Sequence, residues 1–195
     1  MAHPVFVGRK AEKEILEEAL LSAENDAENA TPASGFHLRL IRPQDNAQVA
    51  RLIRTVMTEF ECTGEGYSIL DPEVDDMHGA YSGSQSVFYV IANQGNETVM
   101  GCGGIAPLAG GDPAICELKK MYFYPELRGL GLGRKLVDRC LEDARNLGFR
   151  QCYLETVVRM VQANALYKKM GFMQLDGPLG STGHNSCDAW YMKRL

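Results

Sequence analysis

Residues 118–133 read LKKMYFYPELRGLGLG, a strand-like run that breaks at a proline and leads through a glycine-rich turn into a helix. Apolar residues recur at helical spacing from Leu132 to Leu147 and predict that helix. Its first turn carries Arg134 and Lys135 and no acidic residue, although acidic side chains usually stabilise this end of a helix. The start of this helix is therefore suited to an anionic ligand.

Gly129, Gly131 and Gly133 alternate through the turn, so no side chain there would keep a ligand from the backbone. The unpaired N–H groups of a helix start bind phosphate groups well. The turn lacks the Gly-Lys pair of a nucleotide P-loop, and its glycine spacing differs from the dinucleotide-binding fingerprint. We therefore predict a cradle for a pyrophosphate group. The alternative is a glycine-rich loop that only caps an amphipathic helix.

Two blocks of sequence carry a resemblance to a known family. Arg128, Gly131 and Gly133, after the strand-and-proline run, resemble motif A of the GNAT superfamily of acyl-CoA-dependent N-acyltransferases. Further on, YLET at residues 153–156 and ANALYKKMGF at residues 163–172 resemble its motif B. The resemblance implies the GNAT fold, an α/β fold with a mixed central sheet of about seven strands and four flanking helices. The sheet would be splayed between the motif A and motif B strands.

Hydrophobic periodicity predicts an α/β chain in the order strand, two helices, three strands, helix, strand, helix, two strands. A hairpin is predicted at Gln94-Gly95-Asn96, between the second and third strands. The predicted segments are residues 36–42, 47–60, 72–81, 86–92, 98–108, 114–124, 132–147, 151–156, 161–170, 172–175 and 187–195.

Composition limits the domain organisation and the partners. With 195 residues, 45% of them hydrophobic, the chain suits one domain with a sizeable core. The net charge is −5, but residues 11–30 alone carry −6, so the other residues sum to about +1. A nearly neutral main domain argues against a nucleic-acid partner, which would need a strongly basic face.

We predict an acidic N-terminal extension and linker at residues 1–35 and the GNAT domain at residues 36–195. A short helix at residues 10–21 could dock on a partner or on the domain; the alternative is a disordered extension. The extension has no long apolar run and is acidic, which argues against a membrane span, a signal peptide and a mitochondrial presequence. We therefore expect a cytoplasmic protein without a membrane partner.

Cysteine and histidine positions do not predict a metal or a disulfide framework. The six cysteines show no framework spacing, and we expect them to be free in a reducing compartment. His184 and Cys187 form a close pair, but no second pair at zinc spacing accompanies them, so we predict no metal.

The resemblance also implies which residues bind the cosubstrate acetyl-CoA. Backbone groups of Met121 and Phe123, with Tyr122 between them, would bind its pantetheine arm in the gap between the splayed strands. The pyrophosphate would lie on the main chain of Arg128, Gly129, Leu130, Gly131, Leu132, Gly133 and Arg134. Asn164 could bind the arm as well. The family's usual asparagine lies seven residues before the motif B tyrosine, however, where this chain has Met160.

Tyr167 and Glu117 are the predicted catalytic residues. Tyr167 occupies the place where many family members keep a tyrosine hydroxyl close to the coenzyme sulfur, and it would act as general acid. Glu117 lies at the offset of the general base of the protein-acetylating branch, and period-two counting places it on the strand face of Met121 and Phe123. Burial on a central strand would raise its pKa. The alternatives are an aromatic core residue for Tyr167 and a paired or surface acid for Glu117.

The segment GSTGHNSCDAW at residues 180–190 joins the last two strands, and the resemblance implies that it overlooks the acceptor site. His184, Asp188 and Trp190 are therefore candidates for acceptor recognition, although each could simply be loop or strand structure. We also expect a carboxylate-rich second wall, which would attract a cationic amine. Its candidates are Glu59, Glu61, Asp75 and Asp76.

The sequence thus predicts an N-acetyltransferase that moves an acetyl group from acetyl-CoA to a primary amine by direct transfer in a ternary complex. The acceptor we favour is a small-molecule amine. A protein lysine or N-terminus is the alternative within enzymes, and a non-catalytic acyl-CoA-binding module is the alternative outside them. A homodimer stays open.

Overall fold

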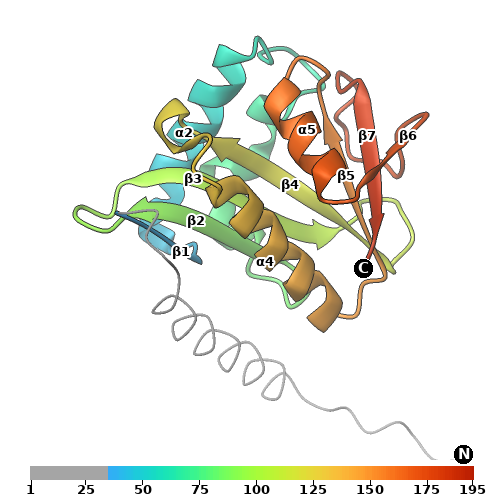
Figure 1. The fold of residues 1–195 in the computed structure, drawn as a ribbon, viewed down its shortest axis with the longest axis horizontal. Helices are drawn as coiled ribbons and strands as arrows, with labels where there is room; N and C mark the ends of the chain where they lie inside the picture. Colours follow the sequence, from blue (N-terminus) through green and yellow to red (C-terminus); the bar gives the residue numbers. More distant parts are fainter. Residues whose placement is uncertain (1–34) are drawn as a thin grey trace, which may run out of the picture. The chain divides into compact units, whose positions relative to one another are not determined.

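The computed structural model describes residues 35–195, which form a mixed seven-stranded sheet in the order β1-β2-β3-β4-β5-β7-β6 (Figure 1). The predicted helix at residues 10–21 lies outside the described residues. The strands are β1 (Phe36–Leu40), β2 (Val87–Asn93), β3 (Val99–Pro107), β4 (Ile115–Phe123), β5 (Gln151–Thr156), β6 (Met173–Leu175) and β7 (Ala189–Arg194). The α-helices are α2 (Asn46–Glu59), α3 (Met77–Ala80), α4 (Leu132–Asn146) and α5 (Val161–Lys169), and the 3-10 turns are η2 (Pro43–Asp45), η3 (Ser68–Leu70), η4 (Pro72–Asp75) and η5 (Pro125–Leu127).

The predicted order of elements is confirmed from residue 36 onward, and the fold is the predicted α/β mixed sheet. The helix predicted at residues 72–81 is instead split into η4 and α3. The hairpin between β2 and β3 is present: the side chains of Asn93 and Asn96 accept hydrogen bonds from the Gly95 and Thr98 amides at 2.8 and 3.0 Å. Such local bonds are why asparagine favours tight turns.

Helices cover both faces of the sheet. The core under α2 contains Val49, Leu52 and Ile53 of the helix packed with Cys102 of β3 and Tyr122 of β4. Figure 1 shows α4 and α5 on one side of the sheet. There Leu136 of α4 lies next to Gly103 of β3, and Tyr167 of α5 packs on Tyr191 of β7 with ring centroids 6.2 Å apart. Helices therefore cover both faces of the sheet, and Leu166 of α5 lies close to Gly133 at the start of α4.

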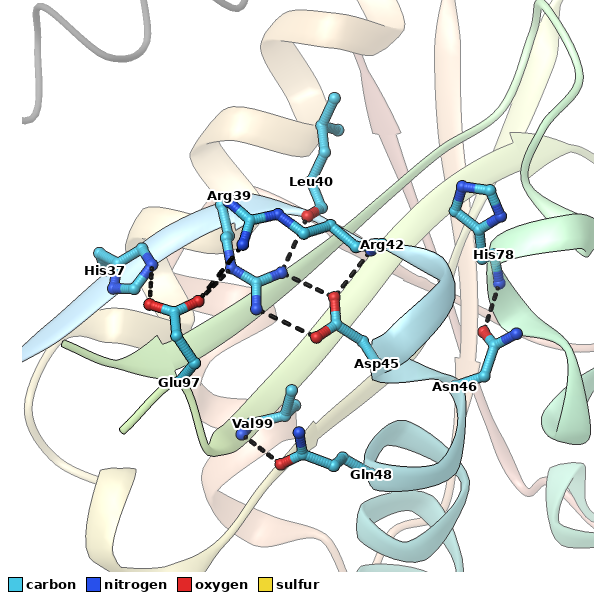
Figure 2. A network of polar contacts seen from close by, with 10 residues as sticks. All are labelled: His37, Arg39, Leu40, Arg42, Asp45, Asn46, Gln48, His78, Glu97 and Val99. Carbon is cyan, nitrogen blue, oxygen red and sulfur yellow. Dashed lines mark hydrogen bonds and ion pairs between the residues drawn. The ribbon is translucent and has the colours of Figure 1, made fainter. Parts of the chain in front are cut away.

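A network of charged side chains ties β1 to the start of α2 and to the β2–β3 hairpin (Figure 2). Arg39 donates to both carboxylate oxygens of Asp45, at 2.7 and 3.0 Å, and to Glu97 at 3.1 Å. The Arg42 amide donates to Asp45 at 2.7 Å, and Asp45 is only 1% exposed. Burial opposes ionisation of Asp45, but these hydrogen bonds outweigh it and lower its pKa. The network therefore fixes the first strand to the domain.

Strand β4 contains a bulge that corrects one prediction. Lys120 has φ +57°, and the pairing register between β3 and β4 shifts at this point. Glu117 is paired with Ala106 and faces the α2 side, whereas Met121 and Phe123 contact Gly103 and Gly101 on the α4 side. The prediction that Glu117 shares a strand face with Met121 and Phe123 is therefore wrong, because one extra residue reverses the alternation.

The sheet splits between β4 and β5. Their parallel pairing covers three residue pairs, Ile115 with Gln151, Cys116 with Cys152 and Glu117 with Tyr153, and ends there. From Leu118 onward the edge of β4 that faces β5 has no strand partner in the described residues. Such an edge presents unpaired backbone donors and acceptors to whatever occupies the gap.

Candidate functional site

The larger of two adjoining cavities has a volume of about 920 Å³ and lies where β4 and β5 diverge. It is bounded by the end of β4, the turn before α4, and α5. Its lining includes Met121, Phe123, Gly129, Gly131, Gly133, Arg134 and Tyr167. The predicted strand segment, the predicted glycine turn and the predicted tyrosine are thus brought together around one space.

The glycine turn presents a row of free backbone donors to this larger cavity. Within the described residues, the amides of residues 129–134 donate no hydrogen bond. Gly129 and Gly131 have φ +78° and +79°, a left-handed conformation that side chains disfavour. A Cβ at either position would meet nothing within 4 Å, so the backbone is open to a ligand. No acidic residue lies in the first turn of α4, which leaves the positive end of the helix uncompensated.

The amide and the guanidinium of Arg128 both make contacts within the protein. Its amide donates to the Pro125 carbonyl at 3.1 Å, and its guanidinium donates to the Phe123 carbonyl at 2.9 and 3.1 Å. The same guanidinium forms a two-pronged ion pair with Glu59 at 2.5 and 2.7 Å. Arg128 therefore anchors the turn to the end of β4 and to α2, and the free amides begin at Gly129.

Tyr167 lies at the junction of the two cavities and lines both. It is 5% exposed and packs against Phe172 and Tyr191, with ring centroids 5.8 and 6.2 Å away. Burial raises the pKa of its hydroxyl well above the usual value. The phenol therefore keeps its proton at neutral pH and is available as a hydrogen donor.

The smaller cavity has a volume of about 60 Å³ and lies on the α2 side of the split. Glu117 lines it, is 3% exposed, and accepts no hydrogen bond from any residue between 35 and 195. Burial raises the pKa of this carboxyl to about 7, against the opposing effect of Lys119. A carboxylate with such a pKa is suited to act as a base near neutral pH.

His184 is the one predicted acceptor-site residue that reaches the smaller cavity. It is 7% exposed, and its Nε2 lies 2.9 Å from Asp71 and 3.3 Å from Ser68. Asp71 also pairs with Lys120, the buried residue of the β4 bulge. These contacts fix the loop before β7 and the loop after α2 to the bulge. They complete the wall around Glu117.

The structure places the other two predicted acceptor residues elsewhere. Asp188 is exposed and accepts a hydrogen bond from the Val158 amide at 2.7 Å, which shapes the loop between β5 and α5. Trp190 packs against a separate apolar cluster that contains Leu108 and Tyr153. Neither Asp188 nor Trp190 lines either cavity.

Asn164, predicted to bind the cofactor arm, is likewise used internally. Its amide nitrogen donates to the Val157 and Met160 carbonyls at 3.0 and 2.9 Å, and its oxygen accepts from the Tyr191 hydroxyl at 2.7 Å. It does not line the larger cavity. Asn164 therefore ties α5 to β7, away from the larger cavity.

The four acids predicted to form a carboxylate-rich wall make other contacts in the structure. Glu59 pairs with Arg128, Asp75 with Arg54, and Asp76 accepts from the Gly79 amide at the start of α3. Glu61 is exposed, 3.9 Å from Arg159. None of these four acids lines the smaller cavity, where Glu117 is joined instead by Glu155.

Sequence reasoning missed Glu155, Ser68, Asp71 and Arg159 as site residues. Glu155 was part of the motif B block, and its position two residues beyond Tyr153, the partner of Glu117, puts it on the same sheet face. Arg159 lines the larger cavity and donates to the Tyr67 hydroxyl at 2.8 Å. No sequence pattern marks Ser68, Asp71 or Arg159, because loops of irregular geometry bring them in.

Two features of residues 35–195 bear on membranes and metals. No helix in this range has both the length and the apolarity needed to cross a membrane. No three His, Cys, Asp or Glu side chains in it are grouped as a metal site would require. All six cysteines are free, and five of them are buried.

Comparisons with known proteins support the family and the fold. The family model of the GNAT acetyltransferases matches residues 51–172. The chain is 43% identical over 168 residues to the uncharacterized N-acetyltransferase YjgM of Escherichia coli K12, covering 86% of this chain and 99% of that protein. Its fold is similar to that of a GNAT-family acetyltransferase from Staphylococcus aureus Mu50, with a TM-score of 0.72, 20% identity, and 82% and 98% of the two chains covered.

It is also similar to yncA from Salmonella typhimurium, whose structure contains its cofactor acetyl-CoA, with a TM-score of 0.63, 19% identity, and 83% and 94% of the two chains covered. The likeness to these two solved structures concerns the fold. The family model and the relative from Escherichia coli go further, because they match most of the chain in sequence. This chain belongs to the GNAT family of acetyltransferases.

Proposed function

We propose that this protein transfers an acetyl group from acetyl-CoA to a small primary amine, directly and within a ternary complex. The observation that carries the proposal is the row of free amides at residues 129–134, facing the larger cavity where β4 and β5 separate. This cavity adjoins the smaller one, and Tyr167 lines both, so a cosubstrate and an acceptor would meet beside Tyr167.

The residues present fit acetyl-CoA. Amides of the turn from Gly129 to Arg134, at the positive end of α4, would hold the pyrophosphate. The unpaired edge of β4, at Met121 and at the Phe123 amide, offers backbone groups to an amide-containing arm, as a sheet edge offers them to an added strand; the Phe123 carbonyl is already bonded by Arg128. Arg128 would act by fixing the turn. Acetyl-CoA supplies the acetyl group as a thioester, which an amine nitrogen attacks.

Glu117 and Tyr167 would move the protons. Glu117, with its pKa raised to about 7, takes a proton from the acceptor ammonium and leaves a neutral nitrogen nucleophile. Tyr167, kept protonated by burial, gives its proton to the sulfur as the carbon–sulfur bond breaks. The nitrogen loses its second proton as the amide forms, and this proton restores the tyrosine. One proton is thus released to solvent for each amide made.

The size of the smaller cavity favours a small acceptor. Its volume is about 60 Å³, and η3, the β4 bulge, β5 and the loop before β7 enclose it. This space suits an amino group and the few carbons next to it. A small amine would be held mainly by these walls.

The experiment that tests the proposal measures free-thiol release from acetyl-CoA over a panel of small amines and short peptides. We expect release that depends on a small amine, with initial-rate lines that intersect when both substrates are varied. Parallel lines, or one equivalent of thiol released without an acceptor, would argue for a covalent enzyme intermediate instead of a ternary complex. Tight acetyl-CoA binding without release for any amine would leave only a binding module.

Two matched tyrosine variants separate the acid from general effects of losing a hydroxyl. Tyr167→Phe should lower kcat by about 100-fold or more and leave acetyl-CoA affinity within about twofold. Tyr124→Phe is the control, because Tyr124 lines neither cavity and its hydroxyl forms no hydrogen bond within residues 35–195. Equal kcat in Tyr167→Phe and the parent would rule out Tyr167 as the acid.

A further inference from the structure

One carboxylate oxygen of Glu155 is hydrogen-bonded, and the other has no hydrogen-bond partner within the described residues. Its Oε1 accepts hydrogen bonds from the Tyr153 hydroxyl at 2.8 Å and from the Thr182 hydroxyl at 2.9 Å. Its Oε2 is buried and has no hydrogen-bond partner within the described part of the chain. A buried carboxylate oxygen without a donor is costly and calls for an explanation.

Glu155 and Glu117 line the same cavity from neighbouring strands. Glu117 is opposite Tyr153 in the β4–β5 ladder, and Glu155 lies two residues further along β5, on the same face. Glu117 is only 3% exposed and accepts no hydrogen bond within residues 35–195. Two ionisable groups that can only accept hydrogen bonds when charged therefore face one small space.

The neighbouring cations of the protein are already paired elsewhere. Lys119 lies 3.1 Å from Glu73, and Lys120 pairs with Asp71 and, at 3.1 Å, with Glu73. Neither lysine bonds Glu117 or Glu155. The donors that these two carboxylates lack must then come from a bound molecule or from water.

We propose that Glu155 is the residue that anchors the ammonium group of the acceptor, so that the substrates are aliphatic primary amines that are cationic at neutral pH. The proposal rests on the acetyl-transfer function above. An alkylammonium carries three N–H donors, enough for Glu155 Oε2 and Glu117 at once. Glu155 holds the ammonium, and Glu117 removes its proton. Neutral acceptors such as alcohols or aromatic amines would leave the carboxylates poorly satisfied and would be used poorly.

The charge of Glu155 also acts on Glu117. Burial has the largest effect on the pKa of Glu117, the charge of Glu155 raises it further, and Lys119, His184 and Lys120 lower it. Removing the charge of Glu155 should therefore lower the pKa of Glu117. The other titratable groups that interact with Glu117 are Tyr81, Tyr153 and Cys187.

Glu155→Gln tests the anchor, because the amide oxygen can still accept from Tyr153 and Thr182 while the charge is lost. We expect the KM for propylamine to rise about tenfold or more, with acetyl-CoA affinity within about twofold. The acid limb of the kcat/KM profile should move to lower pH. Asp188→Asn is the matched control, since it removes one carboxylate from the neighbouring loop outside both cavities and should change neither quantity.

Two measurements without turnover separate this proposal from the acetyl-transfer function. Carboxyl-carbon NMR of glutamate-labelled protein should show Glu117 titrating at lower pH in Glu155→Gln than in the parent. Calorimetry with coenzyme A present should show that propylamine binds the parent, that Glu155→Gln binds it about tenfold more weakly, and that 1-propanol binds neither. Unchanged Glu117 titration together with equal propylamine binding would overturn the anchor, even if the enzyme acetylates amines. Absence of turnover with weakened binding would instead support the anchor and remove the transferase function.

Discussion

Replacing Glu117 by Gln should make the protein more stable at alkaline pH while removing the proposed base. Burial raises the pKa of Glu117 to about 7 from the ordinary value of 4.5. A difference of this size between the folded and unfolded states corresponds to about 3 kcal/mol. The side chain is almost fully buried, so solvent screening reduces this figure little. The native chain thus carries an ionised carboxylate at a cost in stability, as functional groups often do.

The sign follows from proton binding. Between pH 4.5 and about 7 the folded protein holds a proton on Glu117 that the unfolded chain has released. The free energy of unfolding of the parent therefore falls, because of Glu117, as pH rises through this window. Gln cannot ionise, so the variant lacks this fall. The difference in free energy of unfolding, variant minus parent, should grow by about 3 kcal/mol between pH 4.5 and pH 8.

Urea unfolding of the parent and of Glu117→Gln at pH 4.5, 6 and 8, without acetyl-CoA, measures this difference. Groups whose pKa does not depend on Glu117 contribute the same pH dependence to both proteins, so their effect cancels in the difference between parent and variant. Glu65→Gln, at an exposed glutamate, is the control and should show no pH-dependent difference from the parent. A constant difference between Glu117→Gln and the parent at all three pH values would refute the buried, proton-binding carboxylate.

Three further substitutions test other parts of the structure. Gly131→Ala should cost about 1–2 kcal/mol and weaken acetyl-CoA binding, because residue 131 has φ +79° although a Cβ would clash with nothing; unchanged Tm with and without acetyl-CoA would contradict this. Asp45→Ala should destabilise the domain by about 2–3 kcal/mol in urea, since it removes two hydrogen bonds from the largely buried Arg39 and leaves it paired only with Glu97 among the described residues, and a loss under about 1 kcal/mol would contradict the network's role. The pKa of Asp45 is lowered in the folded protein. The stabilisation that Asp45 gives is therefore fully present above its ordinary pKa and is lost as pH falls through the lower pKa of the folded state. Asn164→Ala should lower Tm and leave acetyl-CoA affinity unchanged in calorimetry, whereas weaker binding would restore the contact predicted from sequence.

Most of the fold could be predicted because its elements are strongly periodic. The helix from Leu132 and the strand from Gln151 begin at the predicted residues. The hairpin after Asn93 follows from turn chemistry that acts within a few residues. These features depend on neighbours along the chain, which the sequence displays directly.

The bulge at Lys120 could not be predicted, because it depends on contacts between distant segments. A lysine with φ +57° on a central strand has no local signature, and its buried ammonium is held by Asp71 and Glu73, almost fifty residues away along the chain. The bulge decides that Glu117 faces the smaller cavity and not the α4 side. Counting alternate residues therefore gave the wrong strand face for Glu117, the candidate base.

The walls of the smaller cavity were predicted least well, for a similar reason. Its walls come from η3, from the loop before β7 and from β5, and only tertiary packing brings them together. His184 was identified because the resemblance places the segment that joins the last two strands over the acceptor site. Asp188 and Trp190 lie in the same segment but face structural partners. Position along the chain thus pointed to a loop that reaches the smaller cavity but could not choose among its residues.

Amide hydrogen exchange with and without acetyl-CoA tests the central claim most directly. The free backbone donors of residues 129–134 should exchange fast in the protein alone and become protected when acetyl-CoA binds, with strong protection confined to this turn and the open edge of β4. Acetyl-CoA binding that leaves the exchange of residues 129–134 unchanged would contradict the pyrophosphate cradle and, with it, the proposed site of acetyl transfer.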